Sequence, residues 1–238
     1  VVYVSTNTIL LWRFSPWRPT FSFRFHPLLE LLPFSSKLLF TSLFTHINNN
    51  IFSALLGRFY TIQQAGYYSQ GSKWTTMGYS TIFGMINSVG QPVFREASED
   101  RQRLQNIFRK LMRFTAFVSF PAMLGLAIVS QELIVISITE KWLPCVPVMQ
   151  ILCVWGAFMP ISTLYSNLMN SIGRPNVYMW NTIALGIFQL LCVWGSYPYG
   201  LNIMLIVYTA ANIFWLLIWH YFAHKHIGIS LLNTLKDI

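Results

Sequence analysis

Apolar stretches long enough to cross a lipid bilayer follow one another along most of this chain. A transmembrane helix needs about 20 consecutive, predominantly apolar residues, and six such stretches alternate here with short polar or charged segments. We therefore predict an all-α integral membrane protein, a bundle of about six transmembrane helices with the end of a further one before them. The predicted spans are residues 34–57, 75–94, 111–138, 147–171, 177–194 and 201–221, and the partial one is residues 1–12.

The low charge content excludes an ordinary soluble domain. Only 10% of the residues are charged, whereas a soluble domain carries about 25%. Three regions are predicted: residues 1–33 as the end of a span with a basic cytoplasmic linker, residues 34–222 as the transmembrane unit, and residues 223–238 as a cytoplasmic tail. Because the chain begins with Val1 inside an apolar run, we interpret it as a piece of a longer protein.

The positive charges sort to one side when the predicted spans are threaded alternately through a membrane. Of the 16 Lys and Arg residues, 13 fall on one side, six of them in the charged stretch 91–113. Lys and Arg in short loops mark the cytoplasmic side of a membrane protein, so the C-terminus is predicted to be cytoplasmic. The net charge of +9 then reflects topology, and we expect no nucleic acid partner.

Two kinds of chemistry find little support in the sequence. The cysteines Cys145, Cys153 and Cys192 lack CxxC spacing and lie in or beside apolar runs, where they act as packing residues. His220 and His224 have the i, i+4 spacing of metal ligands, but no Cys or carboxylate accompanies them, and we expect neither a metal nor another cofactor.

Several connecting segments are similar to those of one family of transporters. The chain resembles the Wzx-like polysaccharide flippases of the multidrug/oligosaccharidyl-lipid/polysaccharide exporter superfamily from about Phe34 to the C-terminus. The segments that carry the resemblance are LGRFYTIQQAGYYSQGSKW, QPVFREASEDRQRLQNIFRKLMR, EKWLPCVPVMQIL and NSIGRP.

The resemblance implies a MATE-like transporter of two helical lobes, of which this chain would be the C-terminal lobe. Such a protein is not an enzyme. It moves an undecaprenyl-pyrophosphate-linked oligosaccharide across the bacterial inner membrane by alternating access, in polysaccharide or lipopolysaccharide biosynthesis. The implied partners are the lipid-linked oligosaccharide, membrane lipid, the missing N-terminal lobe, and the polysaccharide polymerase and glycosyltransferases of the same process. The chain alone is not expected to transport.

Polar residues within the first complete span are the main candidates for substrate binding. Polar groups are costly inside a bilayer and should face protein or a water-filled cavity. His46, when protonated, could attract a pyrophosphate, and Asn49 and Asn50 could donate hydrogen bonds to sugar hydroxyls. The alternative is hydrogen bonding between helices.

Further candidates lie near the ends of the spans. Lys37, Arg58 and Lys73 could contact phosphate at the two membrane faces, or extend to the interface without binding substrate. Asn87, Gln91 and Arg95 share one helix face at i, i+4 and i+8 spacing, which suits the lining of a cavity, although Arg95 could also anchor the loop that follows.

Two other functions remain open. A cation-coupled multidrug exporter of the same superfamily usually needs a buried carboxylate, and no predicted span holds one near its centre. A membrane polysaccharide polymerase or transferase would need catalytic acids or bases in longer loops. We rank the exporter second and the enzyme third.

Overall fold

The structure is a computed structural model. It describes residues 2–14, 29, 32, 35, 36, 39–44, 46, 55–231, 234 and 236. The chain divides into two compact units, Val1–Ser36 and Lys37–Ile238. The first contains helix α1 (Val2–Phe14), whose side chains from Val4 onward are exposed.

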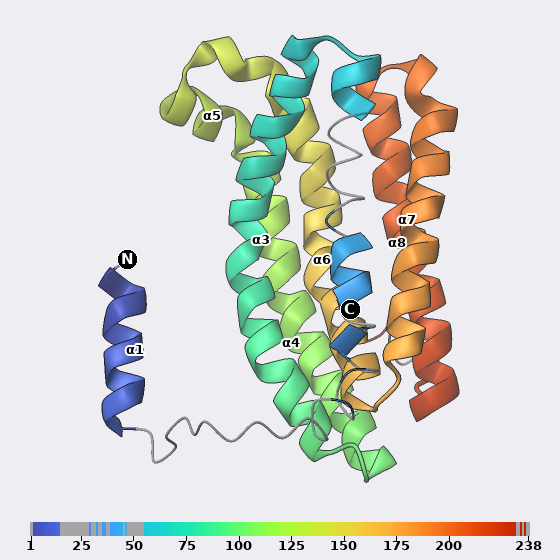
Figure 1. Cartoon of the computed structure of the whole chain (residues 1–238). Helices are drawn as coiled ribbons and strands as arrows, with labels where there is room; N and C mark the ends of the chain where they lie inside the picture. Colours follow the sequence, from blue (N-terminus) through green and yellow to red (C-terminus); the bar gives the residue numbers. More distant parts are fainter. Residues whose placement is uncertain are drawn as a thin grey trace. The chain divides into compact units, whose positions relative to one another are not determined.

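The second unit is a bundle of long helices (Figure 1). All regular elements of the described residues are helical, as predicted for the fold class. In chain order they are α3 (Ile62–Glu96), α4 (Arg101–Ile128), α5 (Ser130–Ile138), the 3₁₀ helix η1 (Glu140–Cys145), α6 (Val146–Ser171), α7 (Pro175–Ser196), the 3₁₀ helix η2 (Tyr197–Tyr199) and α8 (Leu201–Ile227).

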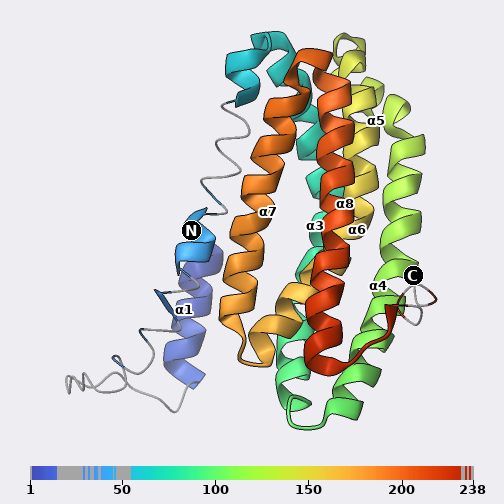
Figure 2. The ribbon, with the colours of Figure 1, turned by 90° about the vertical axis from the view of Figure 1, so that its right-hand side faces the viewer.

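Helix α6 is the packing centre of this bundle. It contacts α3, α4 and α8, and α7 packs mainly against α8 (Figures 1 and 2). The apolar stretch of α6 is 56% buried, about twice the share of the equivalent stretches of α4, α7 and α8. An apolar helix that is covered on most sides forms the core around which the others are arranged.

Four segments among the described residues are long and apolar enough to cross a membrane. They are α4, η1 with α6, α7 with η2, and α8. The protein is thus a multi-pass, all-α membrane protein. The predicted number of six spans is not reproduced, because half of residues 34–57 lie outside the described residues. The predicted span 75–94 falls within α3, which does not reach the same hydropathy.

Helix α3 also corrects the sequence prediction for residues 58–74, whose Tyr, Gln and Gly residues are typical of an interfacial turn with a short surface helix. The helix begins at Ile62 and continues without a break to Glu96. Its start is a capping box in which the Thr61 hydroxyl accepts a hydrogen bond from Gln64 N at 3.2 Å, and the Gln64 side chain accepts one from Thr61 N at 3.2 Å. Because these bonds satisfy two otherwise unpaired backbone donors, the helix can begin this early.

The span predicted at residues 111–138 is divided in the structure. Helix α4 ends at Ile128, and Ser130–Ile138 forms the separate helix α5. The sequence predicts that this helix begins near Glu99, because the acidic Glu99 and Asp100 suit the positive end of its dipole, and α4 begins at Arg101. The Asp100 carboxylate accepts hydrogen bonds from Gln102 N at 2.9 Å and Arg103 N at 3.0 Å, which caps the helix.

The two ends of the bundle differ in charge. At one end, which we call the basic end, Arg101 Nε donates to Ile227 O at 3.0 Å and ties the start of α4 to the end of α8. At the opposite end, Tyr60 Oη donates to Tyr197 O at 2.8 Å, and Tyr67 lies edge-on to Trp142. The cations sort between these ends as the threading predicts: Arg95, Arg101, Arg103, Arg174 and Lys225 at the basic end, and Arg58 and Lys141 at the other.

Glycines allow α3 to approach its neighbours closely. A Cβ atom on Gly71 would lie 3.0 Å from Val148 Cγ1 and 3.1 Å from Met149 N, and one on Gly78 would lie 2.6 Å from Leu126 Cδ2. A Cβ atom on Gly84, by contrast, would meet nothing within 4 Å. The sequence suggests close helix packing at Gly78, Gly84 and Gly90, because small residues permit it. The structure shows close contacts at Gly78 and Gly90 but not at Gly84.

We expect Gly71→Leu to destabilise the protein and Gly84→Leu to leave its stability nearly unchanged. The leucine at position 71 would meet the backbone of α6, and such overpacking costs about 1–3 kcal/mol. Thermal unfolding midpoints of the purified full-length protein in detergent measure the difference. Equal losses in the two variants would show that Gly71 is not a contact point between the helices.

Candidate functional site: a polar face of helix α3

Helix α3 passes through the bundle beside α6 but has a much more polar exposed face than the four apolar spans. At its start, Gly71 packs against the first turn of α6, and near its end the Ser171 hydroxyl donates to Gln91 O at 3.2 Å. The part of α3 between these contacts therefore runs alongside the apolar length of α6. A helix in this position lies at membrane depth.

One line of exposed residues runs along this part of α3, and we call it the α3 polar stripe. Its spacings of seven, four, four and seven residues keep all members on the same side of a helix. The members are Lys73, Ser80, Gly84, Ser88 and Arg95, and every one of them is exposed. The same line also carries the exposed Met77 and Gln91, and Thr81 lies on its flank.

The stripe has the length of the hydrocarbon core of a membrane. Lys73 and Arg95 are about 33 Å apart along the helix axis at about 1.5 Å per residue, and the hydrocarbon core is about 30 Å thick. If the membrane is crossed along α6, a cation lies near each membrane face, and small or hydroxyl-bearing residues lie between the two cations, together with Met77 and Gln91. A surface of this kind is unfavourable against lipid tails and should face protein or water.

The two serines of the stripe retain acceptor capacity for a ligand. Ser80 Oγ donates to Met77 O at 3.0 Å, and Ser88 Oγ donates to Met85 O at 2.9 Å. A hydroxyl that donates to its own helix still has lone pairs that can accept a hydrogen bond. Sugar hydroxyl groups are donors of the matching kind.

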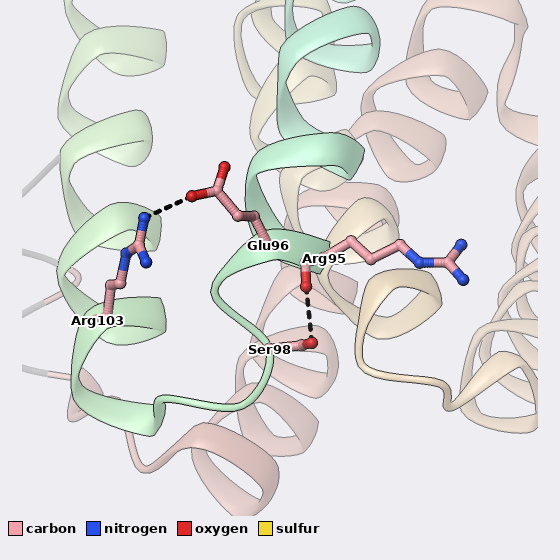
Figure 3. A network of polar contacts seen from close by, with 4 residues as sticks. All are labelled: Arg95, Glu96, Ser98 and Arg103. Carbon is pink, nitrogen blue, oxygen red and sulfur yellow. Dashed lines mark hydrogen bonds and ion pairs between the residues drawn. The ribbon is translucent and has the colours of Figure 1, made fainter.

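Arg95 and Lys73 have no carboxylate partner among the described residues. Near Arg95, the carboxylate of Glu96 pairs instead with Arg103, at 2.7 Å between Glu96 Oε1 and Arg103 Nη2. Figure 3 shows the Arg95 side chain extending away from this ion pair, while its carbonyl oxygen accepts a 2.7 Å hydrogen bond from Ser98 Oγ. The Arg95 guanidinium is available to an anion.

Asn87 and Gln91, which were predicted to share a face with Arg95, take part in contacts between helices. Gln91 Nε2 donates to Asn167 Oδ1 at 3.1 Å, and Asn167 Nδ2 donates to Asn87 Oδ1 at 3.1 Å. Asn167 belongs to α6 and is 3% exposed. These bonds join α3 to α6, although the exposed side chain of Gln91 also borders the polar stripe.

For the remaining predicted substrate-binding residues, the described part of the chain shows no contact with the α3 polar stripe. Lys37, Asn49 and Asn50 lie outside the described residues. His46 is described as an exposed helical residue that has an interaction of its own. Arg58 is exposed and lies beside Phe59, which stacks on Tyr197 at the end of the bundle opposite the basic end.

Sequence reasoning missed the residues that complete this region. Ser80 and Ser88 share the face of Lys73 and Arg95, and their spacing was visible in the sequence. Asn167 was also visible as a polar residue in a predicted span, but only the packed structure shows which helix it contacts.

The histidines near the end of α8 have separate partners. The Tyr165 hydroxyl and His220 Nδ1 are 3.2 Å apart, and His224 Nδ1 lies 2.8 Å from Ile229 O. Within the described part of the chain, no group of three or more His, Cys, Asp or Glu residues could hold a metal ion.

The bundle of apolar spans defines a multi-pass helical membrane protein, and α3 adds an exposed polar surface to it. Its family is given by sequence comparison. The profile of a family described as "Polysaccharide biosynthesis protein" matches residues 1–147, and the chain belongs to this family.

Individual relatives agree with this assignment. The chain is 25% identical over 191 residues to the "Teichuronic acid biosynthesis protein TuaB" of Bacillus subtilis, and the alignment covers 79% of this chain and 40% of the relative. It is 27% identical over 173 residues to the "Lipopolysaccharide biosynthesis protein WzxC" of Escherichia coli, covering 72% of the chain and 35% of the relative. An "Uncharacterized membrane protein in cps region" of Klebsiella pneumoniae is 28% identical over 158 residues, 66% of the chain and 33% of that protein.

The matched part of the chain thus spans about two fifths or less of the length of these curated relatives. No solved structure matches the chain significantly. The comparisons identify a membrane protein of polysaccharide biosynthesis.

We expect Asn167→Leu to weaken the contact between α3 and α6. The substitution removes the partner of both Asn87 and Gln91, and hydrogen bonds between membrane helices contribute on average about 0.6 kcal/mol each, with a maximum near 1.7 kcal/mol. The thermal unfolding midpoint of the full-length protein should fall. Asn106→Leu, at an exposed position of α4, is the matched control, and an equal effect of both changes would contradict the structural role of Asn167.

Proposed function

We propose that the full-length protein containing this chain moves a lipid-linked oligosaccharide across the bacterial inner membrane. The α3 polar stripe is the observation that carries the proposal. It offers hydroxyl groups and two cations over the full hydrocarbon thickness, which suits a ligand made of sugars and phosphate. The names of the relatives TuaB and WzxC, which refer to teichuronic acid and lipopolysaccharide biosynthesis, support the same class of substrate.

The stripe would act as one wall of a water-filled cavity. In the proposed orientation the basic end is cytoplasmic, so that Arg95 attracts the pyrophosphate of a substrate entering from the cytoplasm. The serine oxygens accept hydrogen bonds from sugar hydroxyls in the middle of the cavity, and Lys73 attracts the phosphates near the opposite face. The other wall would be a second lobe, and alternating access would expose the cavity to each side in turn.

A cation at each face lowers the cost of moving a phosphate through a region of low dielectric constant. Charge-assisted hydrogen bonds between Arg or Lys and phosphate are roughly twice as strong as neutral ones. Because Arg95 and Lys73 have no carboxylate partner among the described residues, a phosphate need not displace an existing ion pair.

The composition of the stripe favours this function over the alternatives. A cation-coupled drug exporter would be expected to place a carboxylate on such a surface, but α3 contains only Glu96, which lies at its end and pairs with Arg103. A polymerase or transferase would need a catalytic acid or base, and the stripe offers hydroxyls and cations. We therefore propose a transporter and not an enzyme.

His46, Asn49, Asn50, Lys37 and Arg58 remain proposed contributors to the same cavity. They precede α3 in the chain and carry the functional groups that sugars and phosphates require. The second lobe, a polysaccharide polymerase and glycosyltransferases remain the proposed partners.

Deletion of the full-length gene tests the function directly. Lipid-linked repeat units should accumulate in the cytoplasmic leaflet. Labelling of the glycans in right-side-out and inside-out vesicles measures how many face each side. If unpolymerised units accumulate in the outer leaflet instead, the protein acts as a polymerase.

We expect Lys73→Gln and Arg95→Gln each to reduce export of the glycan by about tenfold or more, because a hydrogen bond to a charged group contributes about 1.5–3 kcal/mol. Export is measured as surface polysaccharide at matched levels of membrane-inserted protein. Lys141→Gln and Lys110→Gln are the controls, since each removes an exposed cation outside α3. If the controls lose as much activity as the α3 variants, the stripe is not the substrate surface.

A further inference from the structure

Helices α7 and α8 form a groove that lies apart from the α3 polar stripe. The groove has a volume of about 480 Å³, within the range of about 300–1,000 Å³ that is typical of small-molecule sites. Its lining is almost entirely apolar and includes Trp180 and Ala184 of α7 and Trp215, Ile218 and Phe222 of α8. We call it the α7–α8 groove.

One buried polar side chain in the wall of the groove has an unused donor. Asn181 is only 5% exposed, and its Oδ1 atom accepts a 3.1 Å hydrogen bond from Trp215 Nε1. This bond fixes the orientation of the amide, and the other end of the amide, Nδ2, is buried without a hydrogen-bond partner. A buried donor without an acceptor is unfavourable, so a ligand that brings an acceptor to this wall would be stabilised.

Positive charges surround the end of the groove that lies at the basic end of the bundle. These charges are Arg174, which immediately precedes α7, and Lys225, which lies in the last turn of α8. His226 follows Phe222 by four residues, so it continues the groove-lining face of α8, and it interacts electrostatically with Arg174 and Lys225.

No acidic residue of either helix balances these charges. The sequences of α7 and α8 contain neither Asp nor Glu. The positive end of the α7 dipole also lies at this point, where it favours an anion. The mouth of the groove thus attracts a negative group, while the groove itself accepts a hydrocarbon chain.

We propose that the α7–α8 groove binds an anionic glycerophospholipid of the surrounding leaflet. The phosphate lies near Arg174 and Lys225, an acyl chain follows the groove past Phe222, Trp180 and Trp215, and an ester carbonyl oxygen accepts the hydrogen bond that Asn181 Nδ2 can donate. This binding is separate from the proposed transport of the oligosaccharide.

Asn181 lies at about the depth at which the ester groups of a glycerophospholipid are expected. Asn181 lies about 9 Å along α7 from its first residue, Pro175, at about 1.5 Å per residue. The interfacial layer on each side of the hydrocarbon core is about 5–8 Å thick, so Asn181 lies near the boundary between head groups and acyl chains, where the glycerol esters are found. A polyprenyl chain has no acceptor at this position, and for this reason we assign the groove to a glycerophospholipid and not to the lipid-linked substrate.

Quenching of tryptophan fluorescence tests the proposal in the full-length protein. Trp180 and Trp215 line the groove, and bromine atoms on an acyl chain quench tryptophans that the chain contacts. The protein is placed in nanodiscs of phosphatidylcholine, and phosphatidylglycerol with brominated acyl chains is added in increasing amounts. We expect saturable quenching that brominated phosphatidylcholine does not reproduce and that is weaker in Trp180→Phe.

Substitutions test separately what the two cations and the Asn181 amide contribute to lipid binding. Arg174→Gln and Lys225→Gln should each weaken phosphatidylglycerol binding about fivefold, from the contribution of one cation near a membrane surface, and Asn181→Leu should weaken it without abolishing the preference for the anionic lipid. Lys110→Gln removes a cation from α4 and should leave binding unchanged. Because Arg174 is exposed, its variant should fold even if Asn181→Leu does not.

Other outcomes would overturn the proposal. Equal quenching by the two brominated lipids would show that the groove does not select an anionic head group, and an equal loss in Lys110→Gln would show a general surface effect. If another segment of the full-length protein fills the groove, brominated lipid will not quench the tryptophan fluorescence that Trp180→Phe removes.

Discussion

Water is absent from the hydrocarbon core of a membrane, and this constraint determines how each polar group of the bundle is placed. A backbone or side-chain donor at that depth must find a partner within the protein or a cavity that admits water. Asn167 meets this requirement through Asn87 and Gln91, and Ser119 meets it by donating to Ala157 O at 2.7 Å. Some groups of the described residues depart from this rule: among them, the cations of the α3 polar stripe remain exposed, and the Asn181 Nδ2 donor is buried without a partner.

The packing of α3 against α6 makes the α3 polar stripe possible. Helix α3 does not need an apolar surface on every side to be held in the bundle. Its glycines bring one face into close contact with neighbouring helices, at Gly71, Gly78 and Gly90. The hydrogen bonds to Asn167 then join its second half to α6. With one face held in this way, the opposite face can carry polar residues that a lipid-facing helix could not, and the polar surface proposed to bind substrate can form.

The sequence predicted the class of fold and the sorting of its charges well, but it placed some elements wrongly. The segment 58–74 was predicted to form an interfacial turn with a short surface helix because Tyr, Gln and Gly are frequent in it, whereas the capping box of Thr61 and Gln64 begins a helix that continues to Glu96. At positions 87 and 91, two amides on one helix face suggested a cavity lining, and the structure shows that they bond to a third amide on α6. The α3 polar stripe and the α7–α8 groove emerged only from the exposure of individual side chains.

The sequence by itself determined that this is a helical membrane protein and which loops carry its positive charges. Both properties follow from local composition, since the cost of placing a residue in lipid depends mainly on that residue and its near neighbours in the chain. The tertiary structure decided which polar residues are consumed in packing and which remain exposed. Asn87 and Ser88 are adjacent in the sequence, yet one bonds to α6 and the other belongs to the polar stripe, because successive residues of a helix point about 100° apart and only the position of α6 determines which direction is covered.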